Sequence, residues 1–273
     1  MSEEKNNEEL RPSKMRGVAF PKAKYGVILA VIVIILVNLI YYKDTIFSLL
    51  IIGISFRLIV FQPDLGTSIV VLLAGSYVLF LAGLSWRFIG SAFAVFILSL
   101  PFLWNNLLAP FQRQRIATLF NPDADPFGTG WNITQSKIAI GSGGIFGKGY
   151  GSGSQAHLDF LPETKTDFIF AVIAEEFGFF GTLILLSIYT FIVFRCFYLS
   201  FNARDRFCRL TIGGLSLIFV TTIFVNLGMV VGILPVVGMP LPFISMGGTS
   251  LLSFYIAFGI IISMASHKKL IRQ

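Results

Sequence analysis

Long apolar runs are the feature that most constrains this sequence. They lie at residues 25–42, 45–61, 68–84, 88–108, 168–197, 210–234 and 249–265. A helix of roughly 20 apolar residues crosses a bilayer core of about 30 Å. The chain is 55% hydrophobic and only 13% charged, unlike a soluble domain. The sequence therefore predicts an all-α polytopic integral membrane protein with about six to seven transmembrane helices.

The runs divide the chain into five parts. These are a tail of mixed charge at 1–24, N-terminal membrane helices at 25–108, one long loop at 109–167, C-terminal membrane helices at 168–266 and a basic tail at 267–273. Segment 195–209 carries four arginines against one aspartate, whereas the long loop balances five basic with five acidic residues. Because basic loops stay on the cytoplasmic side, we expect a cytoplasmic C-terminus and an extracytoplasmic long loop.

The net charge of +7 does not indicate a nucleic-acid partner. The basic residues flank the apolar runs, where they determine the orientation of the helices in the membrane. Cys196 and Cys208 lie around the arginine-rich segment and are predicted to be free thiols. The two histidines are too few for a histidine-built metal site, and no nucleotide-binding or zinc spacing occurs. We expect no organic cofactor.

Two polar motifs are predicted to share the extracytoplasmic face. Asp64 in QPDLGTS (62–68) ends an apolar run, and the proline and glycine around it mark either irregular backbone lining a cavity or a simple turn. Arg113 and Arg115 in FQRQRI (111–116) open the long loop. They either clamp a diphosphate or anchor the end of a helix.

A glycine-rich stretch, AIGSGGIFGKGYGSGSQ (139–155), lies in the same loop. It lacks the pattern of a soluble nucleotide-binding loop. Its glycines would let backbone amides approach an anion, with Lys137 and Lys148 adding positive charge. The alternative is a flexible loop lying against the membrane.

Asp167 ends the long loop, immediately before the apolar run that begins at Phe168. A carboxylate in this position is either a helix cap or a water-accessible group able to take part in chemistry at the membrane surface. We expect it to be exposed, with the ordinary pKa of an aspartate, and therefore ionised at neutral pH.

These motifs resemble the SEDS family, the RodA/FtsW/SpoVE peptidoglycan glycosyltransferases, and most of all its RodA branch. The resemblance rests on QPDLGTS, on residues 112–181 and on NLGMVVGILPVVGMPLPFISMGGTSLL (226–252), and covers roughly 45–266. Residues 1–44 stand where the family has further N-terminal helices, so the chain is expected to lack them. Met246 stands where the family usually has tyrosine.

The resemblance implies a lipid II-dependent glycosyltransferase of the bacterial cytoplasmic membrane, with an extracytoplasmic active face and a role in cell elongation, rod shape and division. It implies transfer of a growing glycan from undecaprenyl diphosphate to the 4-hydroxyl of lipid II. Asp167 is the implied catalytic residue, either as general base or as a ligand of Mg²⁺ or Mn²⁺. The predicted substrate-binding residues are Asp64, Arg113, Arg115, Lys137, Lys148, Gln155 and Glu163.

The implied partners are a class B penicillin-binding protein, which supplies the transpeptidase, and other membrane proteins of the elongation complex. Two other functions stay open. One is a lipid II flippase, which would use the same cavity for transport. The other is a truncated, non-catalytic scaffold of the elongation complex.

Overall fold

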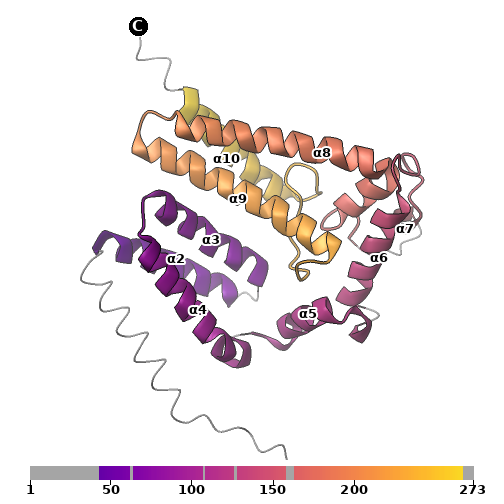
Figure 1. Ribbon diagram of the computed structural model, residues 1–273, viewed down its shortest axis with the longest axis horizontal. Helices are drawn as coiled ribbons and strands as arrows, with labels where there is room; N and C mark the ends of the chain where they lie inside the picture. Colours follow the sequence, from indigo (N-terminus) through magenta and orange to yellow (C-terminus); the bar gives the residue numbers. More distant parts are fainter. Residues whose placement is uncertain (1–42, 62–63, 107, 126–127, 158–162, 267–273) are drawn as a thin grey trace, which may run out of the picture. The chain divides into compact units, whose positions relative to one another are not determined.

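The computed structural model describes residues 43–61, 64–106, 108–125, 128–157 and 163–266 (Figure 1). The chain divides into two units, Met1–Tyr42 and Lys43–Gln273, and every described residue lies in the second. The predicted run at 25–42 and both predicted tails lie outside the described residues.

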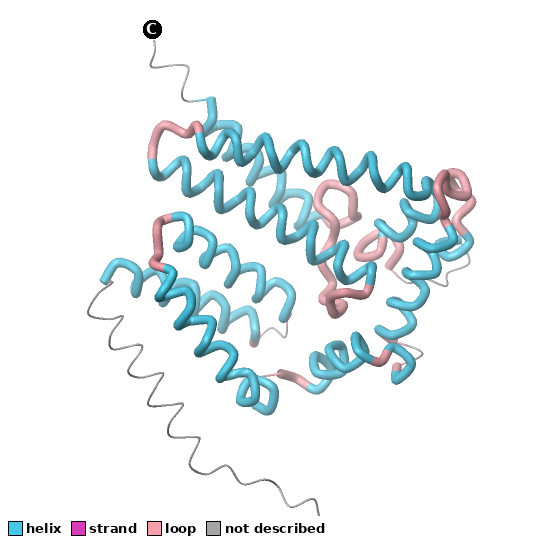
Figure 2. The backbone as a smooth tube through the Cα atoms, in the orientation of Figure 1, coloured by secondary structure: helices cyan, strands magenta, loops and turns pink. Residues whose placement is uncertain are grey.

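The described residues form helices joined by turns and loops, without a strand (Figure 2). The helices are α2 (Lys43–Val60), α3 (Leu65–Leu81), α4 (Trp86–Asn106), α5 (Pro110–Phe120), η1 (Pro122–Ala124), α6 (Thr129–Ser142), α7 (Ser154–His157), α8 (Ile169–Phe201), α9 (Arg206–Val231) and α10 (Gly248–Ser266). Six of the predicted runs correspond to α2, α3, α4, α8, α9 and α10. The predicted all-α membrane fold is thus confirmed.

Segment 109–167 is more ordered than the word loop suggests. It contains α5, η1, α6 and α7, and α6 packs against both α8 and α9. Its moderate polarity hid these helices from a search for apolar runs.

Helix α9 is the centre of the bundle. It packs against α8, α3, α6 and α10. At its middle, the buried ring of Phe219 contacts the rings of Tyr189, Phe243, Phe254 and Phe258, with centroids 5.1–6.0 Å apart. These contacts tie α8, α10 and the loop after α9 to one aromatic core.

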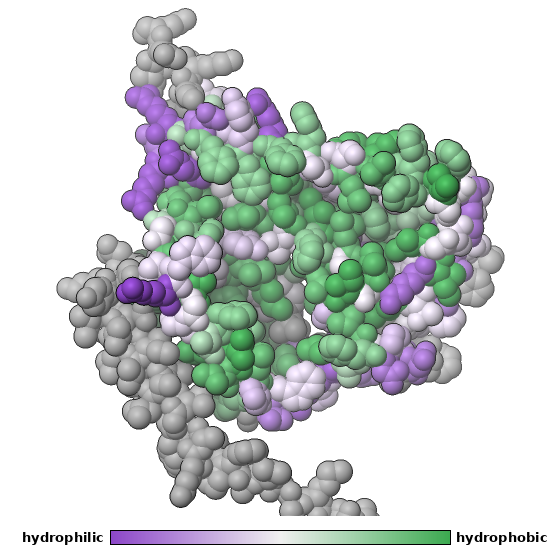
Figure 3. All heavy atoms as spheres, in the orientation of Figure 1, coloured by the Kyte–Doolittle hydropathy of each residue, from purple (hydrophilic) through white to green (hydrophobic). Residues whose placement is uncertain are grey.

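The outer surface of the bundle is apolar. Helices α8, α9 and α10 are long and apolar enough to cross a membrane, while α2, α3 and α4 carry shorter apolar stretches. Large apolar side chains of α8, among them Phe191 and Phe194, are mostly exposed. Figure 3 shows hydrophobic residues over the body of the bundle and hydrophilic ones gathered toward its two ends. A surface of this kind is suited to lipid.

Gly178 breaks α8 nine residues after it begins, with φ 67° and ψ −165°. The glycine-rich stretch satisfies the freed backbone groups: the amides of Lys148 and Gly149 donate to the carbonyls of Glu175 and Glu176 at 3.0 and 2.9 Å. The part of α8 after the break, residues 179–201, spans about 34 Å, close to the thickness of a bilayer core. The first part of α8, and Asp167 before it, therefore lie beyond the length of helix that a bilayer core requires.

Candidate active site

The backbone at Asp167 is held by two other parts of the chain. Asn226 of α9 donates from Nδ2 to the Asp167 carbonyl at 2.9 Å and to the Met239 carbonyl at 2.6 Å. Ser245 donates from Oγ to the Thr166 carbonyl. Asn226 is fully buried. The start of α8 is thus fixed to α9 and to the loop at 232–247, which contains Met239 and Ser245.

The carboxylate of Asp167 does not cap α8. The capping position is taken by Phe168, and no side chain there bonds to the first turn. The capping alternative is therefore wrong, and the carboxylate is left available for other contacts.

The prediction of an exposed Asp167 with an ordinary pKa is also wrong. The side chain is half-buried, and desolvation by this burial raises the pKa of its carboxyl. The negative charge of Glu163 raises it further, and the Arg115 guanidinium opposes both effects. A β-carbon placed on Gly238 would lie 3.5 Å from Asp167 Oδ2, so the loop backbone approaches the carboxylate closely.

The predicted polar motifs meet at the loop near Gly238. Arg115 donates from Nη1 to the Val236 carbonyl at 3.2 Å. On α3, Gly66 lies so close to this loop that a β-carbon would stand 2.8 Å from the Val237 carbonyl oxygen. Asp64 precedes Gly66 by two residues, so Asp64 and the long loop lie at the same end of the bundle.

Asp64 and Arg113 have local partners. Asp64 caps α3, accepting from the Thr67 amide at 3.0 Å and the Thr67 hydroxyl at 2.7 Å. Arg113 donates to the carbonyls of Leu108 and Asn105, both at 3.0 Å, and so secures the end of α4. The anchoring alternative describes Arg113 in this structure, and substrate contact by either residue stays a prediction.

Lys148 and Gln155 meet at Glu175 rather than at Asp167. Lys148 Nζ lies 2.6 Å from Glu175 Oε1, and the Ser154 hydroxyl and the Gln155 amide donate to the same carboxylate. Glu175 has no solvent-exposed surface. These contacts clamp the glycine-rich stretch to α8. We call Lys148, Ser154, Gln155 and Glu175 the Glu175 clamp.

Glu163 and Lys137 flank this region. Glu163 has a left-handed backbone (φ 54°) and accepts from the Thr166 hydroxyl at 2.8 Å, while its carbonyl accepts the Phe168 amide at 3.2 Å. The exposed side chain of Lys137 lies over Gly232, and a β-carbon placed on Gly232 would lie 2.5 Å from Lys137 Cε. The positive φ of Gly232 (76°) ends α9 at this crossing.

The described residues contain no group of three histidine, cysteine or acidic side chains placed to hold a metal ion. The described side chains thus do not form a complete cage for the predicted Mg²⁺ or Mn²⁺. A Mg²⁺ ion bound by one carboxylate together with substrate phosphates would need no such cage, so that role of Asp167 stays a prediction.

Sequence reasoning missed Asn226 and Ser245. A search of the apolar spans for charged residues passes over both. The available signal was an amide in the middle of an apolar run, since a polar side chain there usually has a specific partner.

The family follows from comparison with known proteins. The family model for FtsW, RodA and SpoVE, described as Cell cycle protein, matches residues 23–270. The chain belongs to this family. The predicted family is thus confirmed.

Two curated relatives illustrate the similarity within the FtsW/RodA/SpoVE family. Peptidoglycan glycosyltransferase MrdB of Escherichia coli K12 is 50% identical over 231 residues, covering 85% of this chain and 62% of MrdB. A probable peptidoglycan glycosyltransferase FtsW of Trichlorobacter lovleyi is 38% identical over 211 residues, covering 77% of this chain and 54% of that protein. The chain spans between half and two thirds of the length of these relatives.

A solved structure supports the same fold. It is described as showing structural coordination of polymerization and crosslinking by a peptidoglycan synthase complex, and one chain of it superposes with a TM-score of 0.70 at 30% identity. The match covers 84% of this chain and 63% of that chain.

Proposed function

We propose that the site around Asp167 polymerises peptidoglycan from lipid II at the extracytoplasmic face of the bacterial cytoplasmic membrane. The observation that carries the proposal is a half-buried carboxylate whose backbone is held by Asn226 and Ser245 and whose side chain does not cap α8. It lies within the part of the chain that is similar to MrdB, a peptidoglycan glycosyltransferase.

The reaction needs one base. The 4-hydroxyl oxygen of lipid II attacks the anomeric carbon of the growing glycan, and the bond from that carbon to undecaprenyl diphosphate breaks. The diphosphate leaves with the bonding electrons, and the hydroxyl proton passes to Asp167. A diphosphate leaves without prior protonation, so no second carboxyl group acting as an acid is required, in contrast to glycoside hydrolysis.

The raised pKa of Asp167 suits this role. A carboxylate with a higher pKa is a stronger base, provided that it is still ionised at the working pH. Desolvation by the surrounding protein is the main cause of the shift, and the nearby Arg115 guanidinium keeps the charged form accessible.

Positive side chains near Asp167 would stabilise the leaving diphosphate. Arg115 is best placed, because it acts electrostatically on Asp167 and contacts the Val236 carbonyl of the adjacent loop. Lys137 is exposed beside Gly232 at the same end of α9. Preorganised cations of this kind stabilise charge that develops in the transition state.

The arginine-rich segment 195–209, which spans the end of α8 and the start of α9, supports a cytoplasmic location for that end of the bundle. Asp167 lies at the opposite end of α8, which would face the outside. The proposed partner is a class B penicillin-binding protein, consistent with a similar chain that belongs to a peptidoglycan synthase complex. The proposed physiological role is cell elongation and rod shape.

The test is polymerisation of labelled lipid II by the purified protein with a class B penicillin-binding protein. The intact chain, its Asp167→Asn variant and a version extended with the N-terminal helices of a full-length relative are compared. Loss of polymer with Asp167→Asn, in whichever form is active, supports the proposal. An unchanged rate contradicts it, and absence of polymer from both well-folded forms favours the scaffold or flippase.

A further inference from the structure

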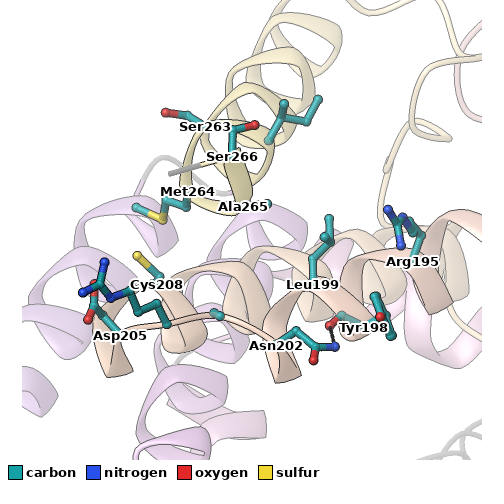
Figure 4. A pocket seen from close by; sticks show the side chains of 13 residues that line it. Arg195, Tyr198, Leu199, Asn202, Asp205, Cys208, Ser263, Met264, Ala265 and Ser266 are labelled. Carbon is teal, nitrogen blue, oxygen red and sulfur yellow. Dashed lines mark hydrogen bonds between the residues drawn. The ribbon is translucent and has the colours of Figure 1, made fainter. Parts of the chain in front are cut away.

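A cavity of about 890 Å³ lies at the end of the bundle away from Asp167. The end of α8, the start of α9 and the last turn of α10 surround it (Figure 4). Figure 4 shows Arg195 at one side of the cavity, Asp205 at the other, and the Cys208 sulfur directed toward Met264. The proposed transfer reaction makes no use of this cavity.

The charged residues among those that line the cavity carry a net positive charge. Arg195 and Arg204 border it, with Asp205 as the acidic lining residue. The whole segment 195–209 holds four arginines against one aspartate. Asn202 and Ser266 add neutral polar groups to the wall. The guanidinium groups favour an anion with several oxygen atoms.

An apolar groove adjoins the cavity. It occupies about 470 Å³ along α8 and is lined by Phe191, Phe194, Phe197 and Phe201. Arg195 and Tyr198 line both the groove and the cavity. The Arg195 guanidinium carbon lies 5.4 Å from the centroid of the Tyr198 ring, at the place where the groove and the cavity meet. A ligand that fills both must therefore carry an anionic head and an apolar tail in one molecule.

We infer that this place binds an anionic glycerophospholipid, with its phosphate at Arg195, where the cavity and the groove meet, and one acyl chain along the phenylalanine groove. Basic pockets between membrane helices commonly hold anionic head groups. A zwitterionic lipid would offer the same tail but would bring its own positive charge to the arginines. The C-terminal segment His267–Gln273 is basic, so it lacks the charge needed to complement this site.

The test measures lipids retained by the purified full chain in zwitterionic detergent, by native mass spectrometry. Dioleoyl phosphatidylglycerol is titrated against dioleoyl phosphatidylcholine, and glycerol-1-phosphate is added as a competitor without a tail. We expect preferential retention of phosphatidylglycerol and no competition at matched concentrations. Arg195→Gln should raise the apparent Kd roughly fivefold.

Arg209→Gln is the matched control, because Arg209 belongs to the same segment but does not line the cavity. Phe194→Ala should weaken phosphatidylglycerol binding and leave the detergent-solubilised protein monodisperse. Cys208 is a free thiol of the cavity wall, while Cys196 is buried. Bound lipid should therefore slow alkylation of Cys208 by a water-soluble maleimide.

Equal retention of the two lipids would overturn the proposal. So would an equal loss from Arg209→Gln, which would indicate general surface charge rather than a site. Full competition by glycerol-1-phosphate would reassign the cavity to a free phosphate ester. Because polymerisation of lipid II is not measured, failure here leaves the proposed function unaffected.

Discussion

Replacing Lys148 by methionine should destabilise the protein by breaking the Glu175 clamp. The substitution leaves the Glu175 carboxylate, which is 0% exposed, with the Ser154 hydroxyl and the Gln155 amide but without a countercharge. Removing one partner of a buried ion pair costs about 3–5 kcal/mol. The Lys148 side chain is 31% exposed, so water can partly replace it. We therefore expect the lower end, about 3 kcal/mol.

This loss corresponds to a fall in the unfolding midpoint of roughly 6–12 °C for a chain of this size. Thermal unfolding of the detergent-solubilised protein measures it, with Lys148→Met, Glu175→Gln and the double variant in one cycle. The double variant should recover most of the loss, because a neutral glutamine can still accept from Ser154 and Gln155. A single variant as stable as the parent, or a double variant no better than Lys148→Met, would refute the role of the clamp.

Three further predictions concern the frame around Asp167. Asn226→Leu removes two buried hydrogen bonds, so it should lower the free energy of unfolding by about 1–2 kcal/mol and slow lipid II polymerisation. The control Thr222→Val removes only a hydrogen bond within α9 and should leave the polymerisation rate unchanged. Glu163→Gln removes a negative charge that raises the pKa of Asp167, so that pKa should fall. Because the base must be ionised, the acidic limb of the kcat/KM profile should then move to lower pH. A move to higher pH would contradict this prediction. Gly178 has a positive φ, and in Gly178→Ala the added β-carbon would lie 2.3 Å from a backbone nitrogen of the glycine-rich stretch. The substitution should therefore lower the free energy of unfolding by at least about 2 kcal/mol, measured by thermal unfolding. Unchanged stability would contradict the observed break in α8.

The membrane helices could be predicted because a bilayer demands continuous apolar length. The residues at which the helices begin and end could not be predicted as accurately. Helix α9 begins at Arg206, before the predicted run, since arginine is a good helix former and its side chain can reach the membrane surface. The break at Gly178 could not be predicted from the sequence, because it depends on backbone hydrogen bonds to a stretch about 30 residues earlier.

The two arginines of α5 show why site residues were harder to predict. Arg113 and Arg115 are two residues apart on one helix, so their side chains point in different directions. Arg113 meets the end of α4, and Arg115 meets the loop beside Asp167. The sequence pattern is the same for both, and only the packing of α5 against distant segments separates an anchor from a candidate catalytic neighbour.

The initial rate of lipid II polymerisation by Asp167→Asn tests the central claim most directly, with Asp205→Asn as the matched control. Asp205 precedes α9 at the opposite end of the bundle, and asparagine is an equally good helix cap, so this change should preserve α9. Loss of a general base predicts a rate reduced by roughly 10²–10⁴-fold for Asp167→Asn, with a much smaller effect at Asp205. A folded Asp167→Asn protein that polymerises at the parental rate would contradict the assignment of Asp167 as the catalytic base.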